Sequence, residues 1–124
     1  MSSPYERTKA ELVKMGYEVG RTEHFNTFVK IRQDLFNCID LIGLKKGSPL
    51  LLIQCTTGDN ASKRIEKMRD KAAIIASTGS TVEMWAWRKV GDRGKRKLWA
   101  VRRERFDLAG VTHNLDEGEV LKEG

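Results

Sequence analysis

The feature that most constrains the fold is a pair of apolar runs, FNCIDLIGL at 36–44 and PLLLIQCTT at 49–57, joined by the short turn KKGS. Runs of this length bounded by turn residues predict strands, and their nearly continuous apolar character predicts burial on both faces, at the centre of a sheet. Each run nevertheless carries a polar side chain, Asp40 in the first and Gln54 in the second, with Thr56 two positions later. These polar positions are the first candidates for a functional site.

The segments on either side of this hairpin predict one helix before it and one after it. In SPYERTKAELVKMG, Ser3 is suited to the N-cap, Pro4 to the first helical position and Gly16 to the stop. YEVGR predicts a short strand that ends at Arg21, and TEHFNTFVKIRQD predicts a loop or irregular arm with a brief strand around FVKI. A second helix is predicted from Asp59 or Asn60 through KRIEKMRDKAAIIAST, because apolar residues recur there at helical spacing.

The C-terminal half predicts a hairpin of two strands, GSTVEMWAWRKV and KRKLWAVRRERF, around GDRG. The order helix, three strands, helix, two strands predicts an α/β fold with a mixed central sheet flanked by helices. A length of 124 residues favours one domain, 1–124, with its core at about 4–105 and an acidic tail at about 113–124.

Cysteine usage and hydropathy indicate the compartment. Cys38 and Cys55 lie in the apolar runs without the spacing of zinc ligands, which favours reduced core thiols over a disulfide or a metal role. No run approaches the ~18 apolar residues of a membrane helix, and the start MSSPYERTK lacks a signal-peptide core. We therefore expect a cytoplasmic protein with no membrane partner.

The positive charge is concentrated in one region of the chain. The net charge is +6, and residues 88–105 hold nine Lys or Arg against two acids, whereas the last dozen residues are acidic. This asymmetry favours an anion-binding surface over a solvated face. The candidate nucleic-acid-binding residues are Arg93, Lys95, Arg96 and Lys97 at the hairpin tip, Arg21, Lys30 and Arg32 near the polar positions, and Arg64 and Lys67 on the second helix.

Three tryptophans accompany this basic hairpin. Trp85 and Trp87 share one face of a predicted strand, and Trp99 lies on the partner strand. Packing in the core or in a dimer interface is favoured for them, and stacking on nucleic-acid bases is the alternative.

The polar positions in the two apolar runs have a chemical interpretation. Neighbouring strands lie about 4.8 Å apart and alternate residues share a face, so Asp40, Gln54 and Thr56 are expected to converge. Mg²⁺ prefers hard oxygen ligands, commonly one or two carboxylates with water and substrate phosphate. A metal held there would activate water and stabilise the charge that develops on a phosphodiester.

The chain resembles the PD-(D/E)XK nuclease superfamily, in particular the archaeal-type Holliday junction resolvases and related phage proteins, over roughly residues 5–75. GYEVGR is similar to the glycine, aromatic, strand and arginine pattern that follows their first helix. IDLIGL is similar to the strand with the metal-binding aspartate, and LLLIQCTTG to the strand with the acid-x-lysine motif. The resemblance implies a restriction-endonuclease-like fold, a Mg²⁺- or Mn²⁺-dependent endonuclease acting on four-way DNA junctions, and a homodimer.

The same resemblance implies a role for each residue of the motif. Asp40 matches the aspartate ligand, Gln54 the acidic position and Thr56 the lysine position, and Glu6 matches the glutamate of the first helix. Gln54 carries no charge and Thr56 no ammonium, so the chain departs from the motif at two positions. The residues that compensate in this interpretation are Glu23 and Asp34 for the charge, with Asp34 a further metal ligand, and Lys63, Arg64 or Lys67 for the cation.

The residues alone leave other interpretations open. Asp40 also suits a turn cap or a pair with Arg21 or Arg32, Gln54 a satisfied core amide, and Glu6 a capping box with the helix N-cap. The alternative functions are a catalytically inactive nucleic-acid-binding module on the same fold, a nuclease acting on linear or single-stranded DNA, and a basic RNA-binding or assembly protein in which the aspartate is structural.

Overall fold

The structure is a computed structural model, and its description covers part of the chain. The described residues are 3–22, 24–26, 31–33, 35–91, 98–115 and 118–120, and for 24–26, 31–33 and 118–120 the description is limited to the backbone.

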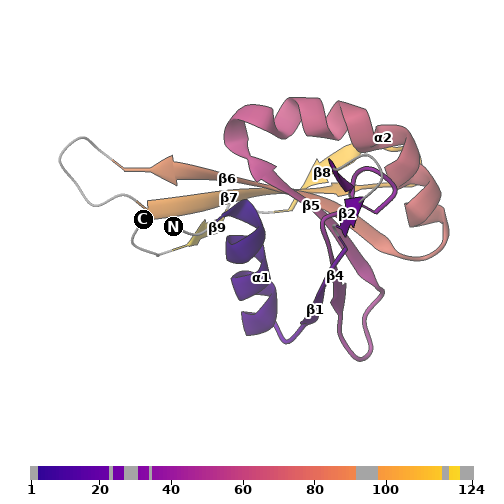
Figure 1. Ribbon diagram of the computed structural model, residues 1–124, viewed down its shortest axis with the longest axis horizontal. Coiled ribbons are helices and arrows are strands. Elements are labelled where there is room, and N and C mark those ends of the chain that lie inside the picture. Colours follow the sequence, from indigo (N-terminus) through magenta and orange to yellow (C-terminus); the bar gives the residue numbers. More distant parts are fainter. Residues whose placement is uncertain are drawn as a thin grey trace.

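The described elements form one main sheet and one small hairpin (Figure 1). The main sheet has the strand order β1-β4-β5-β6-β7-β8, with β9 also paired to β7, and β2 pairs with β3. Strands β5 and β6 are parallel and the other pairs are antiparallel, so the predicted mixed α/β class is confirmed. The elements in chain order are α1 (Pro4–Lys14), β1 (Glu18–Arg21), β2 (His24–Asn26), β3 (Ile31–Gln33), β4 (Leu41–Leu44), β5 (Leu51–Thr57), the 3₁₀ turn η1 (Gly58–Asn60), α2 (Ala61–Ser77), β6 (Thr81–Val90), β7 (Leu98–Phe106), β8 (Thr112–Asn114) and β9 (Gly118–Val120).

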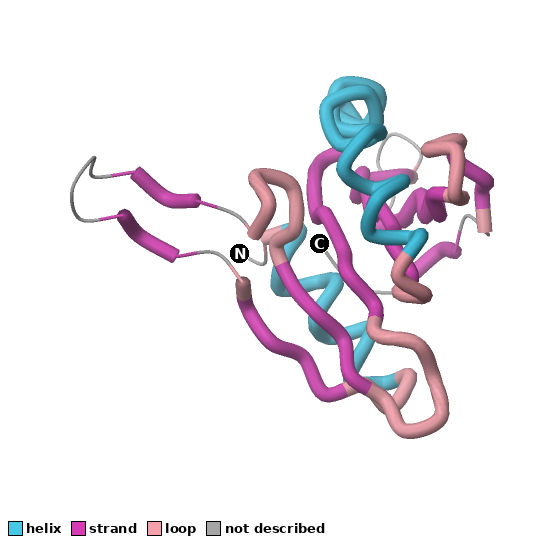
Figure 2. The backbone as a smooth tube through the Cα atoms, turned by 90° about the vertical axis from the view of Figure 1, so that its right-hand side faces the viewer, coloured by secondary structure: helices cyan, strands magenta, loops and turns pink. Residues whose placement is uncertain are grey.

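The two helices lie on opposite faces of the sheet (Figures 1 and 2). Leu52 of β5 packs in one core cluster with Ile65 and Met68 of α2. Ile53 packs in a second cluster with Leu12 of α1. Since alternate residues of a strand point to opposite faces, the even-numbered positions of β5 face the α2 side and the odd-numbered positions face the α1 side.

Helix α1 begins and ends where its sequence predicts. The Ser3 hydroxyl accepts a hydrogen bond from the backbone N–H of Glu6 at 3.2 Å, and Pro4 occupies the first helical position. The helix ends at Lys14, and Gly16 follows with a φ of 92°, a conformation that glycine adopts without strain.

The tryptophans pack in the core on the α1 side of the sheet. Trp85 and Trp87 are each 1% exposed, and the Trp87 indole N–H donates to the Thr8 hydroxyl of α1 at 2.9 Å. The Arg7 guanidinium lies 3.4 Å from the centre of the half-buried Trp99 ring. Core packing is therefore confirmed for Trp85 and Trp87, which leaves neither ring exposed for base stacking.

The first apolar run is not a continuous strand. Residues 36–38 form a turn, closed by an isolated bridge between Leu35 and Ile39, and the strand starts only at Leu41. Phe36 and Asn37 have φ values of 54° and 62°, in the left-handed region that interrupts an extended chain. The prediction of a strand over 36–44 is therefore wrong in its first half.

The segment predicted as an acidic tail takes part in the main sheet. Strands β8 and β9 both pair with β7, and so they supply hydrogen-bond partners along its outer edge. Cys38 and Cys55 are buried in the core, as predicted, and the described residues contain no disulfide between them. Among the described residues, no helix is long and apolar enough to cross a membrane.

Candidate functional site

The candidate site lies where the chain enters β4, beside β5. The register that pairs Leu41 with Ile53 brings Asp40 next to Gln54. The Asp40 backbone N–H donates to the Ile53 carbonyl at 2.9 Å, and the Asp40 carbonyl accepts from the Thr22 N–H at 3.0 Å. Asp40 is thus held between the end of β1 and β5 by backbone hydrogen bonds on both sides.

The Asp40 carboxylate and the Gln54 amide are in direct contact. Asp40 Oδ2 accepts hydrogen bonds from Gln54 Nε2 at 2.7 Å and from the Cys55 backbone N–H at 2.8 Å. Gln54 Nε2 also donates to the Cys55 carbonyl at 3.2 Å, and the Gln54 side chain is 3% exposed. The structure therefore brings the two residues together, with the glutamine presenting its N–H to the carboxylate rather than its oxygen.

Thr56 lies on the same face of β5 as Gln54, and it is buried. Its hydroxyl offers an oxygen but no positive charge. The predicted sources of a compensating cation, Lys63, Arg64 and Lys67, are on the first turns of α2, which follows β5 through η1. Lys63 and Lys67 are exposed and Arg64 is half-buried.

The structure does not bring Glu6 to this pair. Helix α1 covers the opposite face of the sheet from Gln54, because its buried Leu12 packs against odd-numbered positions of β5. Glu6 is exposed on α1, where it lines a shallow surface hollow with Tyr5 and Lys9. Its assignment as a site residue rests on the resemblance alone.

The side chain of Arg21 contacts helix α1. Its guanidinium lies 4.7 Å from the centre of the Tyr5 ring. Burial raises the pKa of the Tyr5 hydroxyl, and the positive charge of Arg21 acts in the opposite direction. Arg21 therefore stacks on an aromatic ring at the end of β1.

Several predicted residues cannot be placed. Two of them, Glu23 and Asp34, are joined in the chain to described residues near Asp40: Thr22 donates to the Asp40 carbonyl, and Leu35 closes the turn that precedes Asp40. The predicted residues whose side chains lie outside the described part are Glu23, Lys30, Arg32, Asp34, Arg93, Lys95, Arg96 and Lys97.

The described residues alone do not form a magnesium site. Among them, no group of three or more His, Cys, Asp or Glu side chains is close enough to hold a metal ion. The described oxygen donors that share the Gln54 face at this point are the Asp40 carboxylate and the neutral oxygens of Gln54 and Thr56. Protein sites for Mg²⁺ usually supply more negative charge than these donors carry, or they leave several coordination positions to water.

A charged cluster on β6 and β7 was not singled out from the sequence. Glu83 is 1% exposed and accepts hydrogen bonds from Arg105 Nε at 3.1 Å and Arg105 Nη2 at 2.8 Å. Arg103 Nη2 lies 3.4 Å from the same carboxylate, and its guanidinium is 4.6 Å from the centre of the Trp85 ring. The sequence does carry a signal for this cluster: Glu83 and Trp85 occupy alternate positions of one predicted strand, and Arg103 and Arg105 occupy alternate positions of its partner.

Comparison of the chain with protein-family models found no match, and comparisons with curated proteins and with solved structures found no significant similarity. The class of the molecule is therefore defined by its own geometry. It is a mixed α/β protein with a part-buried carboxylate–amide pair formed by Asp40, at the entry to β4, and Gln54 of β5.

Proposed function

We propose that the chain is a metal-dependent DNA endonuclease that cleaves branched DNA, with the four-way Holliday junction as its substrate. The observation that carries the proposal is the contact between Asp40 and Gln54, on adjacent central strands between two helices on opposite faces. An aspartate on one strand and two polar residues at alternate positions on the next is the arrangement in which this chain resembles the PD-(D/E)XK nucleases.

In this proposal Asp40 is the principal ligand of Mg²⁺ or Mn²⁺. Because the described donors carry too little charge, the proposal assigns the second carboxylate to Glu23 or Asp34. The bound ion supplies an activated water and stabilises charge on the phosphodiester. Gln54 positions the aspartate, since its N–H and the Cys55 N–H both hold the same carboxylate oxygen.

The proposal gives the cations of α2 and of the β6–β7 hairpin the task of binding phosphates. Lys63 and Lys67 are exposed on the helix that follows β5. Contacts from Lys and Arg to phosphates supply most of the salt-sensitive affinity for DNA. The proposal also includes a cytoplasmic homodimer, because a two-fold dimer matches the symmetry of a four-way junction.

A second candidate function is DNA binding without cleavage on the same fold. It is favoured by the donor role of Gln54, which satisfies the Asp40 carboxylate without a metal, and by the buried threonine at the lysine position. A carboxylate that accepts hydrogen bonds from a neutral amide and from a backbone N–H is stable within a fold without a metal ion.

Cleavage of a labelled four-way junction in the presence of Mg²⁺ tests the first proposal against the second. We expect symmetric nicks with the unmodified protein, fewer on a linear duplex of the same sequence, and none with Asp40→Asn. Asp59→Asn is the matched control, since it removes an exposed carboxylate from the η1 turn just beyond β5. Tight junction binding with no cutting by any of these proteins would establish the binding module and exclude the nuclease.

A further inference from the structure

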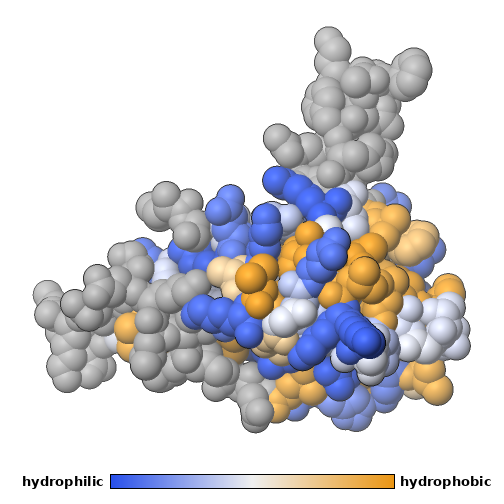
Figure 3. All heavy atoms as spheres, turned by 90° about the horizontal axis from the view of Figure 1, so that it is seen from below, coloured by the Kyte–Doolittle hydropathy of each residue, from blue (hydrophilic) through white to orange (hydrophobic). Residues whose placement is uncertain are grey.

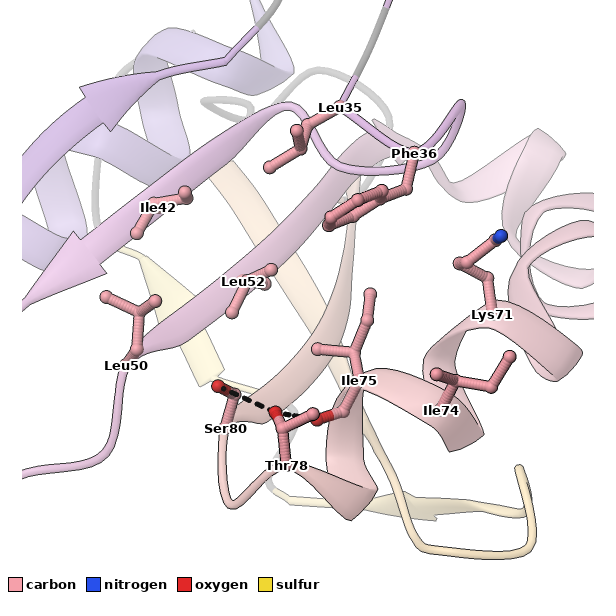
Figure 4. A pocket seen from close by; sticks show the side chains of 10 residues that line it. All are labelled: Leu35, Phe36, Ile42, Leu50, Leu52, Lys71, Ile74, Ile75, Thr78 and Ser80. Carbon is pink, nitrogen blue, oxygen red and sulfur yellow. Dashed lines mark hydrogen bonds between the residues drawn. The ribbon is translucent and has the colours of Figure 1, made fainter.

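An apolar groove of about 400 Å³ lies beside α2, on the face of the sheet that α2 only partly covers (Figure 4). Its floor is formed by Ile42 of β4, Leu50 just before β5 and Leu52 of β5. Ile74 and Ile75 of α2 form one wall, and the turn with Leu35 and Phe36 overhangs the other side.

The groove remains open because no described element packs over β4 on this face. Helix α2 packs against β5, β6 and β7, and Gly20, which pairs with Ile42 on β1, brings no side chain to cover it. Leu44 continues the apolar floor two residues beyond Ile42 and is exposed, as is Ile74 at 61%. Contiguous apolar surface of this kind marks a binding site more often than a scattered exposed residue does.

Phe36 adds a second, independent observation. Its side chain is 52% exposed and overhangs the groove, and its φ of 54° is a strained conformation for a bulky residue. Asn37 has a similar backbone conformation, which asparagine tolerates better. The turn therefore holds an aromatic ring over solvent at an energetic cost, as is common at ligand-binding sites.

The hydrogen bonding of the floor decides what kind of polypeptide fits. Strands β4 and β5 are both paired on their two sides, to β1, to each other and to β6, so they offer no free edge to an extended peptide. A helix satisfies its own backbone and needs only apolar contact. Its diameter of about 10 Å matches the width of two strands beside α2.

The charge around the groove indicates whether an acidic or a basic helix would bind there. Lys71 stands at its rim near Phe36 (Figure 4). Lys67 is four residues earlier on α2, and so it lies one turn away on the same side of the helix. Lys46 is exposed in the turn that joins β4 to β5. Glu18, opposite Leu44 on β1, is the acid on the far edge. Cations along the α2 wall complement acidic residues flanking an apolar stripe.

We propose that this groove is the docking site of an acidic amphipathic helix from a partner protein, laid beside α2 with its apolar stripe on Ile42, Leu50 and Ile74. The groove adjoins the proposed nuclease site, because Ile42 and Leu52 lie two residues from Asp40 and Gln54 on the same face of the sheet. Docking of the helix does not depend on the nuclease activity. Apolar residues are also exposed on the face seen from below (Figure 3), so exposure alone does not identify the groove. The strained overhang, the fully paired floor and the cationic wall identify it.

The test uses a displayed library of helical peptides that share an apolar stripe and vary among Glu, Lys and Gln at the flanking positions. We expect selection on the protein to enrich Glu, and the selected peptide to lose at least about tenfold in affinity for Ile74→Glu. Lys71→Glu should reverse the preference for acidic flanks. Val13→Glu is the matched control, because Val13 is 56% exposed on α1, on the opposite face.

Several outcomes would overturn the proposal. They are enrichment of Lys-flanked peptides, equal binding to Ile74→Glu, and selection of no helical binder. A dimer that Ile74→Glu dissociates in sedimentation would assign the groove to a second copy of the chain. A lipid recovered from the purified protein and lost in that variant would assign it to a small apolar ligand. Junction cleavage by Ile74→Glu is measured in parallel, so that failure of the nuclease proposal is seen separately.

Discussion

At the scale of single residues, the side chain of Gln54 determines how Asp40 is accommodated. A half-buried carboxylate accepts two N–H groups on one oxygen, and the neutral amide adds no charge to repel it. A second carboxylate at this distance would repel the first unless a metal ion or a shared proton offset the charge. The amide thus makes the pair stable in the absence of metal.

Gln54→Glu tests this account directly. Without metal, we expect the substitution to lower the free energy of unfolding by about 1–3 kcal/mol, because two carboxylates then face each other. Added Mg²⁺ should raise the melting temperature of the variant, since an ion that binds only the folded state stabilises it. Thermal unfolding with EDTA and with Mg²⁺ measures both effects.

The double variant Asp40→Asn with Gln54→Glu is the control for that measurement. It keeps one carboxylate in the pair, so it should lose the repulsion and the response to Mg²⁺ together. If Gln54→Glu alone is as stable as the unmodified protein in EDTA and its melting temperature does not change with Mg²⁺, a carboxylate at position 54 does not form a metal site with Asp40.

A second prediction at this scale concerns Asp107 in the turn between β7 and β8. His113 Nε2 lies 2.8 Å from Asp107 Oδ2, and the N–H groups of Ala109 and Val111 donate to Oδ1. The hydrogen bond to His113, followed by that from Val111, lowers the pKa of the Asp107 carboxyl below its ordinary 3.8. A carboxyl whose pKa is lower in the folded state stabilises the fold above its unfolded pKa, and this contribution is lost as the pH falls through the folded pKa.

Asp107→Asn should therefore lower the urea midpoint at neutral pH and lose that deficit as the pH falls below about 4. Urea titrations from neutral to acid pH give the comparison, with Asp59→Asn as an exposed control. If the urea midpoint of Asp107→Asn stays below that of the unmodified protein by the same amount at every acid pH, the hydrogen bonds of the side chain stabilise the turn and its charge does not.

At the scale of elements, β6 and β7 are joined by a buried acid and two arginines. The Glu83 carboxylate accepts both hydrogen bonds from Arg105, and Arg103 covers Trp85. Removing one partner of a buried ion pair leaves the others without compensation, at a cost of roughly 3–5 kcal/mol when all are fully buried. The arginines are partly exposed here, so a smaller cost is expected.

Glu83→Gln should therefore destabilise the fold by about 2–3 kcal/mol, measured by urea unfolding. The control is Glu66→Gln, which removes a carboxylate that is 73% exposed and pairs with Arg69 on the surface of α2. Exposed pairs contribute about 0–1 kcal/mol. Equal losses in the two variants would mean that the β6–β7 cluster contributes no more than a surface pair.

The same scale shows how far the sequence predicts the structure. Local signals placed α1, because Ser3, Pro4 and Gly16 act within a few residues of the helix. The turn residues GDRG between two strand-like segments placed β6 and β7. The turn after Leu35 was missed because Phe36 is as apolar as a strand residue, and only tertiary packing compensates for its left-handed backbone.

The candidate site was predicted in position but not in its details. The strand order implied that Asp40 and Gln54 would meet, and they do. Which atom of the amide faces the carboxylate depends on the Cys55 backbone groups beside it, which no residue pattern reveals. Likewise, the face on which α1 packs places Glu6 away from the pair, and that face is decided by the core around Leu12.

At the scale of the whole molecule, three of the nine cations in the basic run at 88–105 are paired with carboxylates on β6 and β7. Arg103 and Arg105 pair with Glu83, and Arg102 Nε donates to Glu104 at 3.1 Å. The chain's net charge of +6 must therefore act on a polyanion mainly through other cations. The proposal assigns that role to the β6–β7 hairpin tip and to Lys63 and Lys67 of α2.

Salt dependence of junction binding separates this assignment from diffuse attraction. Replacing Lys95 and Arg96 by Gln should weaken binding and reduce the slope of log affinity against log salt concentration by about 2, because each lost phosphate contact removes about 0.9. Replacing Lys9 and Lys14 on α1 by Gln removes the same charge from another surface, and should leave the slope nearly unchanged. Fluorescence anisotropy over a range of salt concentrations measures both pairs. If both pairs reduce the slope equally, binding follows net charge alone, and the hairpin tip is not the contact surface.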